Sequence, residues 1–147
     1  MQRYTICEID LAAIRHNVGV MKAHIAGGAK FLAVVKADAY GHGAVPVAKA
    51  ALEAGADMLA VAIPEEGIAL RHAGITAPIL VLGGIEEAAA RDVVQSGLTQ
   101  VVFDEARIRA LAQAGQALGE TAKVHLKLDT GMNRIGVRTK DEVKALV

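Results

Sequence analysis

A lysine at the end of an apolar run is the first residue in this sequence whose type and position suggest chemistry. Residues 31–35 are apolar and partly β-branched, which is typical of a strand buried on both faces, and Lys36 follows them directly. A lysine at the carboxyl end of a buried strand is partly removed from water, which disfavours its charged form. The resulting amine is a nucleophile that can form a Schiff base with an aldehyde. The position also suits a lysine that extends to solvent or pairs with Asp38.

The turn after that lysine and a second polar segment hold the other candidates. Residues 40–43, Tyr-Gly-His-Gly, precede an expected helix and can bring backbone or a phenol close to an anion. Arg134 offers a planar fork of donors for a carboxylate or a phenolate oxygen, and Lys127 ends another strand. Both also fit as side chains that reach water. Met132 and Asn133 could approach the side chain of a substrate or pack within their own loop.

The elements that position these residues alternate regularly along the chain. Apolar residues at helical spacing after Asp10 predict a helix that ends at Gly27-Gly28. Further helices are expected over residues 44–54, 64–74, 86–97, 104–118 and from 141 onward, and strands over residues 31–35, 58–61, 79–82, 100–103 and 123–128. One helix in each interval of about twenty residues predicts an all-parallel α/β sheet with right-handed crossovers.

Two architectures share this rhythm, an open doubly wound sheet and a (β/α)8 barrel. The chain has 147 residues, fewer than the roughly 250 of a complete barrel. The last predicted strand favours the barrel, because Lys123, His125 and Lys127 alternate with apolar residues and would place three polar groups on one face. Enzyme barrels hold such residues near their catalytic end, whereas the centre of an open sheet rarely does.

Three contiguous segments resemble the alanine racemase family. Residues 34–43, Val-Val-Lys-Ala-Asp-Ala-Tyr-Gly-His-Gly, are similar to its pyridoxal phosphate attachment site, and residues 127–136 to the segment after its fifth barrel strand. Tyr4 through Asn17 resembles the opening of the family. The resemblance covers essentially the whole chain. It implies that residues 1–147 are a single partial domain, about five-eighths of a (β/α)8 TIM barrel, without the later barrel strands and the carboxyl-terminal β domain.

The resemblance also implies roles for individual residues. Lys36 would carry pyridoxal 5'-phosphate as a Schiff base and act as one catalytic base, and Tyr40 would contact the cofactor phosphate. Arg134 would bind the substrate carboxylate and the phenolic oxygen of the cofactor, with Met132 near the substrate. Lys127, as a carbamate, would hold Arg134 in place, because carbamylation turns a cation into an anion.

By the same resemblance, the full protein interconverts L- and D-alanine and supplies D-alanine for peptidoglycan. The second base and the arginine facing the pyridine nitrogen come from later parts of the family's chain, and the family forms a homodimer. We therefore expect this chain to be inactive alone. The alternatives are a non-catalytic half-barrel module that self-assembles, a related short barrel that carries the cofactor without turnover, and an unrelated flavodoxin-like domain.

Composition and charge indicate which classes of binding partner and which cellular compartment to expect. Formal net charge is zero, which argues against nucleic acid or an anionic membrane as a partner. Cys7 is the single cysteine, expected as a small buried residue on a first strand, and fits a reducing cytoplasm. No long apolar run or signal-peptide pattern is present, so we expect a soluble, unprocessed chain. The histidines lack metal-ligand spacing, and Glu65-Glu66 is expected as helix-start charge, so no metal site or acidic dyad is predicted.

Overall fold

The sheet is all-parallel, and its strands stand side by side in the order of the chain. The computed structural model describes residues 5–25 and 27–147. Its one five-stranded sheet has the order β1-β2-β3-β4-β5. The strands are β1 (Leu32–Val34), β2 (Met58–Val61), β3 (Ile79–Val81), β4 (Thr99–Val102) and β5 (Lys123–Leu126).

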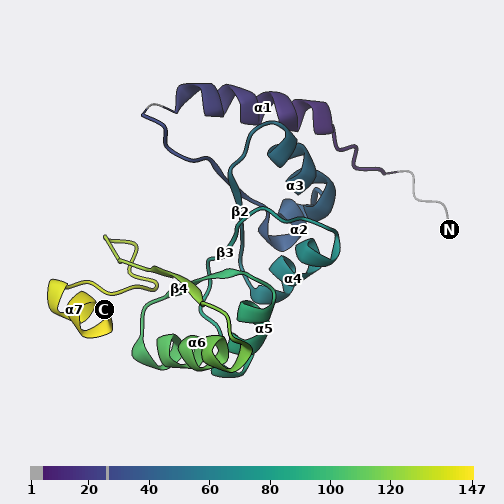
Figure 1. Cartoon of the computed structure of the whole chain (residues 1–147). Coiled ribbons are helices and arrows are strands. Elements are labelled where there is room, and N and C mark those ends of the chain that lie inside the picture. Colours follow the sequence, from purple (N-terminus) through teal and green to yellow (C-terminus); the bar gives the residue numbers. More distant parts are fainter. Residues whose placement is uncertain (1–4, 26) are drawn as a thin grey trace.

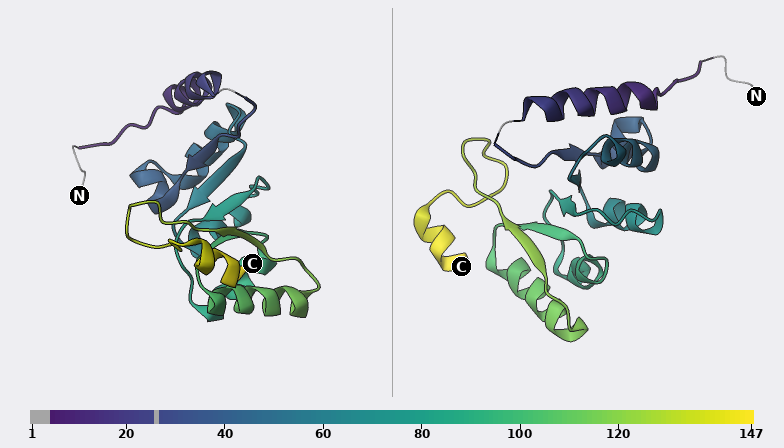
Figure 2. Two further views of the ribbon diagram at one scale, coloured as in Figure 1. Left: turned by 90° about the vertical axis from the view of Figure 1, so that its left-hand side faces the viewer. Right: turned by 45° about the horizontal axis from the view of Figure 1, so that its top comes forward.

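This strand order decides between the two architectures. A doubly wound sheet reverses its direction of growth at a switch point, so its strands are not in sequence order. Here each new strand is added on the same side of the previous one, as in a (β/α)8 barrel. The helices between residues 44 and 118 accordingly follow one another in an arc along one face of the sheet, while the last helix of the chain lies apart from this arc, as Figures 1 and 2 show. The chain therefore forms a curved segment of a TIM barrel, and the doubly wound alternative is wrong.

The helices begin and end where the local sequence allows. They are α1 (Leu11–His24), α2 (Lys36–Gly41), α3 (Ala44–Glu53), α4 (Pro64–His72), the 3-10 turn η1 (Glu87–Ala89), α5 (Ala90–Gln95), α6 (Glu105–Leu118) and α7 (Lys140–Leu146). Asp10 caps α1 by accepting the N–H groups of Ala12 and Ala13, at 2.8 and 3.1 Å. Gly119 ends α6 in the left-handed conformation that favours glycine.

The two faces of the sheet pack differently. Leu59, Val61, Ile79 and Val81 face the helices and belong to the main core. The alternate residues on the other face form a smaller cluster, centred on Ala60, Leu80 and Val101. This second face corresponds to the inner wall of a barrel, and no helix of the arc covers it (Figure 2).

Several expected features differ from the structure. Cys7 is exposed and lies in an irregular segment before α1, so its expected place on a buried strand is wrong. The helix expected over 86–97 is shorter and begins with the 3-10 turn η1. The last strand ends at Leu126, and Leu128 instead forms an isolated parallel bridge with Val137. Tyr4, the first residue of the opening segment used above, lies outside the described residues.

Candidate functional site at the carboxyl end of the sheet

Register places Lys36 on the inner face, at the carboxyl end of β1. Val34 pairs with Ala60, which belongs to the inner cluster, and the Val35 N–H continues the ladder to the Ala60 carbonyl at 2.8 Å. Val35 itself is buried in the helix-side core, so the next side chain alternates to the inner face. Lys36 is half-buried, and its Nζ lies 5.9 Å from the centre of the Tyr40 ring.

Within α2, the four residues after Lys36 form a left-handed turn and not an ordinary right-handed helix. Residues Ala37 to Tyr40 all have φ between 51° and 56°, although none is glycine. Left-handed helical backbone costs about 1–2 kcal/mol per residue in L-amino acids, so surrounding contacts must hold it. Part of that support is internal, since the Ala39 N–H donates to the Val35 carbonyl at 3.0 Å and the Gly43 N–H to the Asp38 carbonyl at 2.9 Å. The turn leaves the Tyr40 side chain 62% exposed beside the lysine.

Two carboxylates brace this turn, one from within it and one from another loop. Asp38 Oδ1 accepts the Ala44 N–H at 2.6 Å, at the first residue of α3. Glu66 Oε1, from the first turn of α4, accepts the Ala37 N–H at 2.6 Å. Within the described residues no ion pair joins Lys36 to Asp38, so the expected alternative of such a pair is wrong and the amine is left unpaired.

From the sequence, Asp38 is expected only as a partner for Lys36, and Glu66 only as helix-start charge. The Pro64-Glu65-Glu66 start was visible as a helix signal, and that part is confirmed by α4. Nothing in the sequence links Glu66 to a turn 29 residues earlier in the chain. Only the parallel pairing of β1 with β2 brings the two loops together.

The polar residues of β5 share the inner face, as the alternation predicted. Thr99 pairs with Lys123, and Val101, an inner-face residue, pairs with His125. Lys127 continues the same alternation at the carboxyl end, and it is half-buried. The candidate site therefore has Lys36 at the end of β1 and Lys127 at the end of β5, on one face of the sheet.

The loop after β5 is organised around Asp129. Its Oδ1 accepts the N–H groups of Gly131 and Asn133, at 3.0 and 2.9 Å, and its Oδ2 accepts Nε of Arg138 at 3.2 Å. The side chain is 2% exposed. These N–H donors, with a smaller effect of the guanidinium, hold the pKa of the Asp129 carboxyl below its ordinary value. Sequence analysis missed Asp129, although a short acidic residue followed by glycine two positions later is a recognisable turn signal.

The loop presents the two remaining candidates to solvent. Met132 is 73% exposed and Arg134 is also exposed. In the part of the chain that the structure describes, neither Arg134 nor Lys127 takes part in an ion pair. The two side chains do not attract each other in this state, since an unmodified lysine repels an arginine. The structure thus brings Lys36 and Tyr40 together, while a contact between Lys127 and Arg134 stays a prediction.

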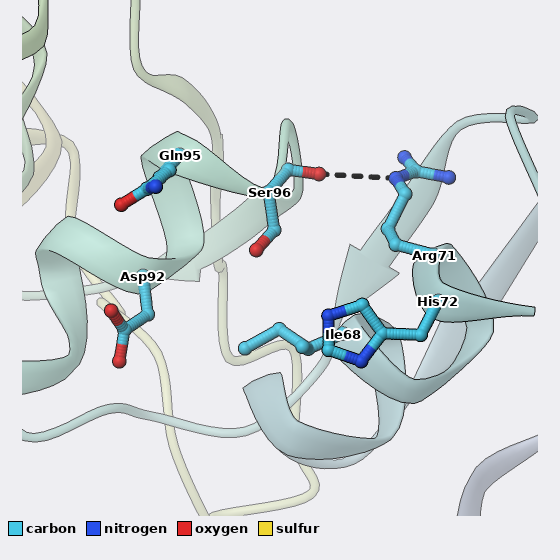
Figure 3. Close-up of a pocket in the computed structure, with 6 residues that line it drawn as sticks. All are labelled: Ile68, Arg71, His72, Asp92, Gln95 and Ser96. Atoms are coloured by element: carbon cyan, nitrogen blue, oxygen red, sulfur yellow. Dashed lines mark hydrogen bonds between the residues drawn. The ribbon is translucent and has the colours of Figure 1, made fainter.

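A separate pocket lies at the opposite end of the sheet, between the carboxyl ends of α4 and α5. Ile68, Arg71, His72, Asp92, Gln95 and Ser96 line it (Figure 3). Arg71 bridges its two sides by donating from Nε to the Ser96 carbonyl at 3.0 Å. Residues at this end of a barrel serve stability, whereas reaction chemistry gathers at the carboxyl end of the strands.

The residues that the structure describes hold neither a metal-binding cluster nor a membrane-spanning helix. Across residues 5–25 and 27–147 there is no group of three or more His, Cys, Asp or Glu side chains placed to hold a metal ion. None of the helices in these ranges has the length and apolar character needed to cross a membrane.

Comparison with known proteins shows what this arrangement is similar to. Residues 9–147 match the family model for the alanine racemase N-terminal domain. Alanine racemase 2 of Oceanobacillus iheyensis is 50% identical over 95% of this chain and 36% of its own length, and the alanine racemase of Symbiobacterium thermophilum is 52% identical over 92% and 36%.

Solved structures agree with the sequence matches. Alanine racemase from Bacillus anthracis with bound L-Ala-P superposes with a TM-score of 0.91 at 42% identity, covering 99% of this chain and 38% of that one. The Clostridium difficile 630 enzyme gives 0.89 at 40% identity, covering 97% and 38%. The chain thus spans little more than a third of the length of these relatives. Together, the family match, these identities and the barrel segment show that the chain belongs to the alanine racemase family and represents its N-terminal domain.

Proposed function

We propose that this chain forms the cofactor-attachment part of a pyridoxal-phosphate-dependent alanine racemase, with Lys36 as the attachment residue. The observation that carries the proposal is the state of the Lys36 amine. It lies at the inner-face end of β1, is half-buried, has no ion-pair partner among the described residues, and lies over the Tyr40 ring. An amine in this setting can condense with an aldehyde.

The surrounding residues fit a phosphorylated aromatic aldehyde. The exposed Tyr40 phenol and the backbone of the glycine-bracketed turn could bind the phosphate beside Lys36. In a complete barrel the first and fifth strands lie on opposite sides, so Lys127 and the loop of Arg134 would face Lys36 across the interior. These donors would therefore suit the cofactor phosphate on the side of Lys36 and a substrate carboxylate on the side of Arg134.

The chemistry divides between the cofactor and the protein. Pyridoxal phosphate, when bound, withdraws electrons from the substrate and so acidifies its Cα proton. Lys36 Nζ would remove and return that proton on one face of the substrate. Arg134 would hold the substrate carboxylate through a bidentate pair, and Met132 would limit the size of the side chain.

Lys127 would orient Arg134 after its neutral amine adds carbon dioxide and releases a proton, which gives a carbamate. As an ordinary lysine it repels the guanidinium, and neither side chain takes part in an ion pair within the described residues. Carbamylation reverses the charge and makes a hydrogen-bonded pair with arginine favourable. We infer that this modification is needed before Arg134 reaches its working position.

Racemisation needs a base on each face of the substrate, and the described residues supply one. We infer that this chain does not racemise alanine by itself, and that the second base comes from a further segment of a dimeric racemase. The full enzyme would act in the cytoplasm and provide D-alanine for peptidoglycan.

A second candidate role is a self-assembling half-barrel module. The exposed inner-face side chain of Val34 and the unpaired outer edges of β1 and β5 favour it. Open edges and apolar faces promote association with further strands.

Borohydride trapping tests the proposal. The chain is mixed with pyridoxal phosphate, reduced, digested, and the labelled lysines are identified by mass spectrometry. We expect one stoichiometric adduct at Lys36, its loss in Lys36→Ala, and no change in Lys49→Ala, because Lys49 is an exposed lysine on α3. Scattered labelling in the unmodified chain would contradict the proposal and favour the module.

A further inference from the structure

Glu66 connects the first two loops at the carboxyl end of the sheet. Its Oε1 accepts the Ala37 N–H at 2.6 Å, in the loop that carries Lys36. Its Oε2 accepts the Ala62 N–H at 2.7 Å and the Ile63 N–H at 3.4 Å, in the loop that follows β2. One carboxylate thus joins two loops that the β1–β2 pairing brings side by side.

The capping function accounts for two of these three contacts. Glu66 lies in the first turn of α4, where an acidic side chain commonly accepts the N–H groups just before the helix. Oε2 alone performs that task. The second oxygen extends to Ala37, the first residue of the left-handed turn, whose N–H has no other acceptor among the described residues.

The contact at Ala37 acts where the backbone conformation is least favourable. Ala37 is the first of five consecutive residues with positive φ, of which only the last, Gly41, is a glycine, and it immediately follows Lys36. A charge-assisted hydrogen bond at this point opposes return of the turn to ordinary backbone. The direction of the Lys36 side chain depends on the backbone that this bond fixes.

We propose that Glu66 is a positioning residue for Lys36, which it serves by holding the left-handed turn through Oε1. This inference rests on the proposed function of Lys36, and it adds a residue to the site that contacts neither substrate nor cofactor. A neutral amide cannot replace the carboxylate, because it has a single oxygen for two loops and would point an N–H₂ group at one of the donors.

The test compares Glu66→Gln with Glu65→Gln. Glu65 is the adjacent, exposed acid in the same helical turn, so its variant makes the same change in charge without touching either loop. Amide hydrogen exchange, followed by NMR, reports the Ala37 N–H directly, and the amide of Leu59 in β2 reports global opening. Borohydride trapping then gives the fraction of pyridoxal phosphate label at Lys36.

In Glu66→Gln we expect exchange at Ala37 to rise about tenfold with Leu59 unchanged, and the Lys36 share of the label to fall severalfold. Glu65→Gln should match the unmodified chain in both measurements. Unchanged exchange at Ala37, or faster exchange with full labelling at Lys36, would overturn the positioning role. Absence of Lys36 labelling in the unmodified chain would instead refute the proposed function, and the exchange comparison would still decide whether Glu66 holds the turn.

Discussion

Arg71 ties together two turns at the amino end of the sheet, and its replacement gives a stability change that can be worked from the structure. Its guanidinium donates to four carbonyls: Ile75 and Ala77 at 2.8 Å, Ser96 at 3.0 Å and Gly97 at 3.2 Å. The first pair belongs to the turn between α4 and β3, the second to the turn between α5 and β4. Burial lowers the pKa of Arg71, but a guanidinium stays charged at neutral pH.

The magnitude follows from the number of donors and the access of water. A hydrogen bond from a charged group contributes about 1.5–3 kcal/mol where it is well buried. Arg71 is half-buried, so water replaces much of what Arg71→Met removes. We therefore expect a loss of about 2–4 kcal/mol in the free energy of unfolding for all four bonds together. For a domain of this length that corresponds to a fall in Tm of roughly 4–16 °C.

Thermal unfolding followed by circular dichroism measures this loss. Arg91→Met is the matched control, because Arg91 is an exposed arginine on α5 and forms no hydrogen bond or ion pair within the described residues. Its Tm should change by no more than about 2 °C. Labelling of Lys36 should be unaffected in both variants at temperatures where they remain folded, since the pocket lies at the opposite end of the sheet. Equal Tm values for the two variants would refute the reasoning.

Three further predictions concern the carboxyl end and the open face. A Cβ at Gly83 would lie 2.6 Å from the Ala62 carbonyl oxygen. Gly83→Ala should therefore lower the free energy of unfolding, measured by urea titration, by about 1–3 kcal/mol. An unchanged urea midpoint would contradict this prediction. The Asp129 carboxyl has a pKa below its ordinary 3.8, so its loop is stabilised above about pH 4 and loses that stabilisation as pH falls through the lowered pKa. The Asn133 amide shift in NMR should follow this transition, and a flat profile down to about pH 2 would count against it. Light scattering should show association that rises with concentration, since Val34 is exposed on the inner face, and a monomer at every concentration would exclude the module.

The regular part of the fold could be predicted from the sequence because its signals are local. Apolar runs of four or five residues marked the first three strands, and the apolar residues after Gln100 marked β4. The alternation of Lys123 and His125 with apolar residues identified β5 and its polar face. Periodicity could not give the strand order, which depends on contacts between segments. Cys7 shows the same limit of local signals. Its apolar character indicated a buried position, but the side chain is exposed, because no described helix or strand covers it.

The candidate site could be predicted by residue type but not by backbone conformation. Ala37 to Tyr40 contain no glycine, so nothing in the local sequence indicates a left-handed turn. Besides its internal hydrogen bonds, the turn is supported by Glu66 from elsewhere in the fold, whose carboxylate accepts the Ala37 N–H. Asp129 was missed for a related reason, since its importance lies in the number of N–H groups that converge on one buried carboxylate.

Because the strands pair in the order of the chain, the sheet that carries the candidate site can form stepwise during synthesis. Paired residues in neighbouring strands are only 26, 20, 19 and 24 positions apart, for example Leu32 with Met58 and Thr99 with Lys123, so each strand can join as it leaves the ribosome. Lys36 and Lys127, by contrast, stand at the two ends of this series. The sheet can therefore grow by short loop closures, while Lys127 reaches the inner face only once the fifth strand has joined. A ribosome-bound chain arrested before Lys123 should already hold the left-handed turn and still lack the opposite wall of the site.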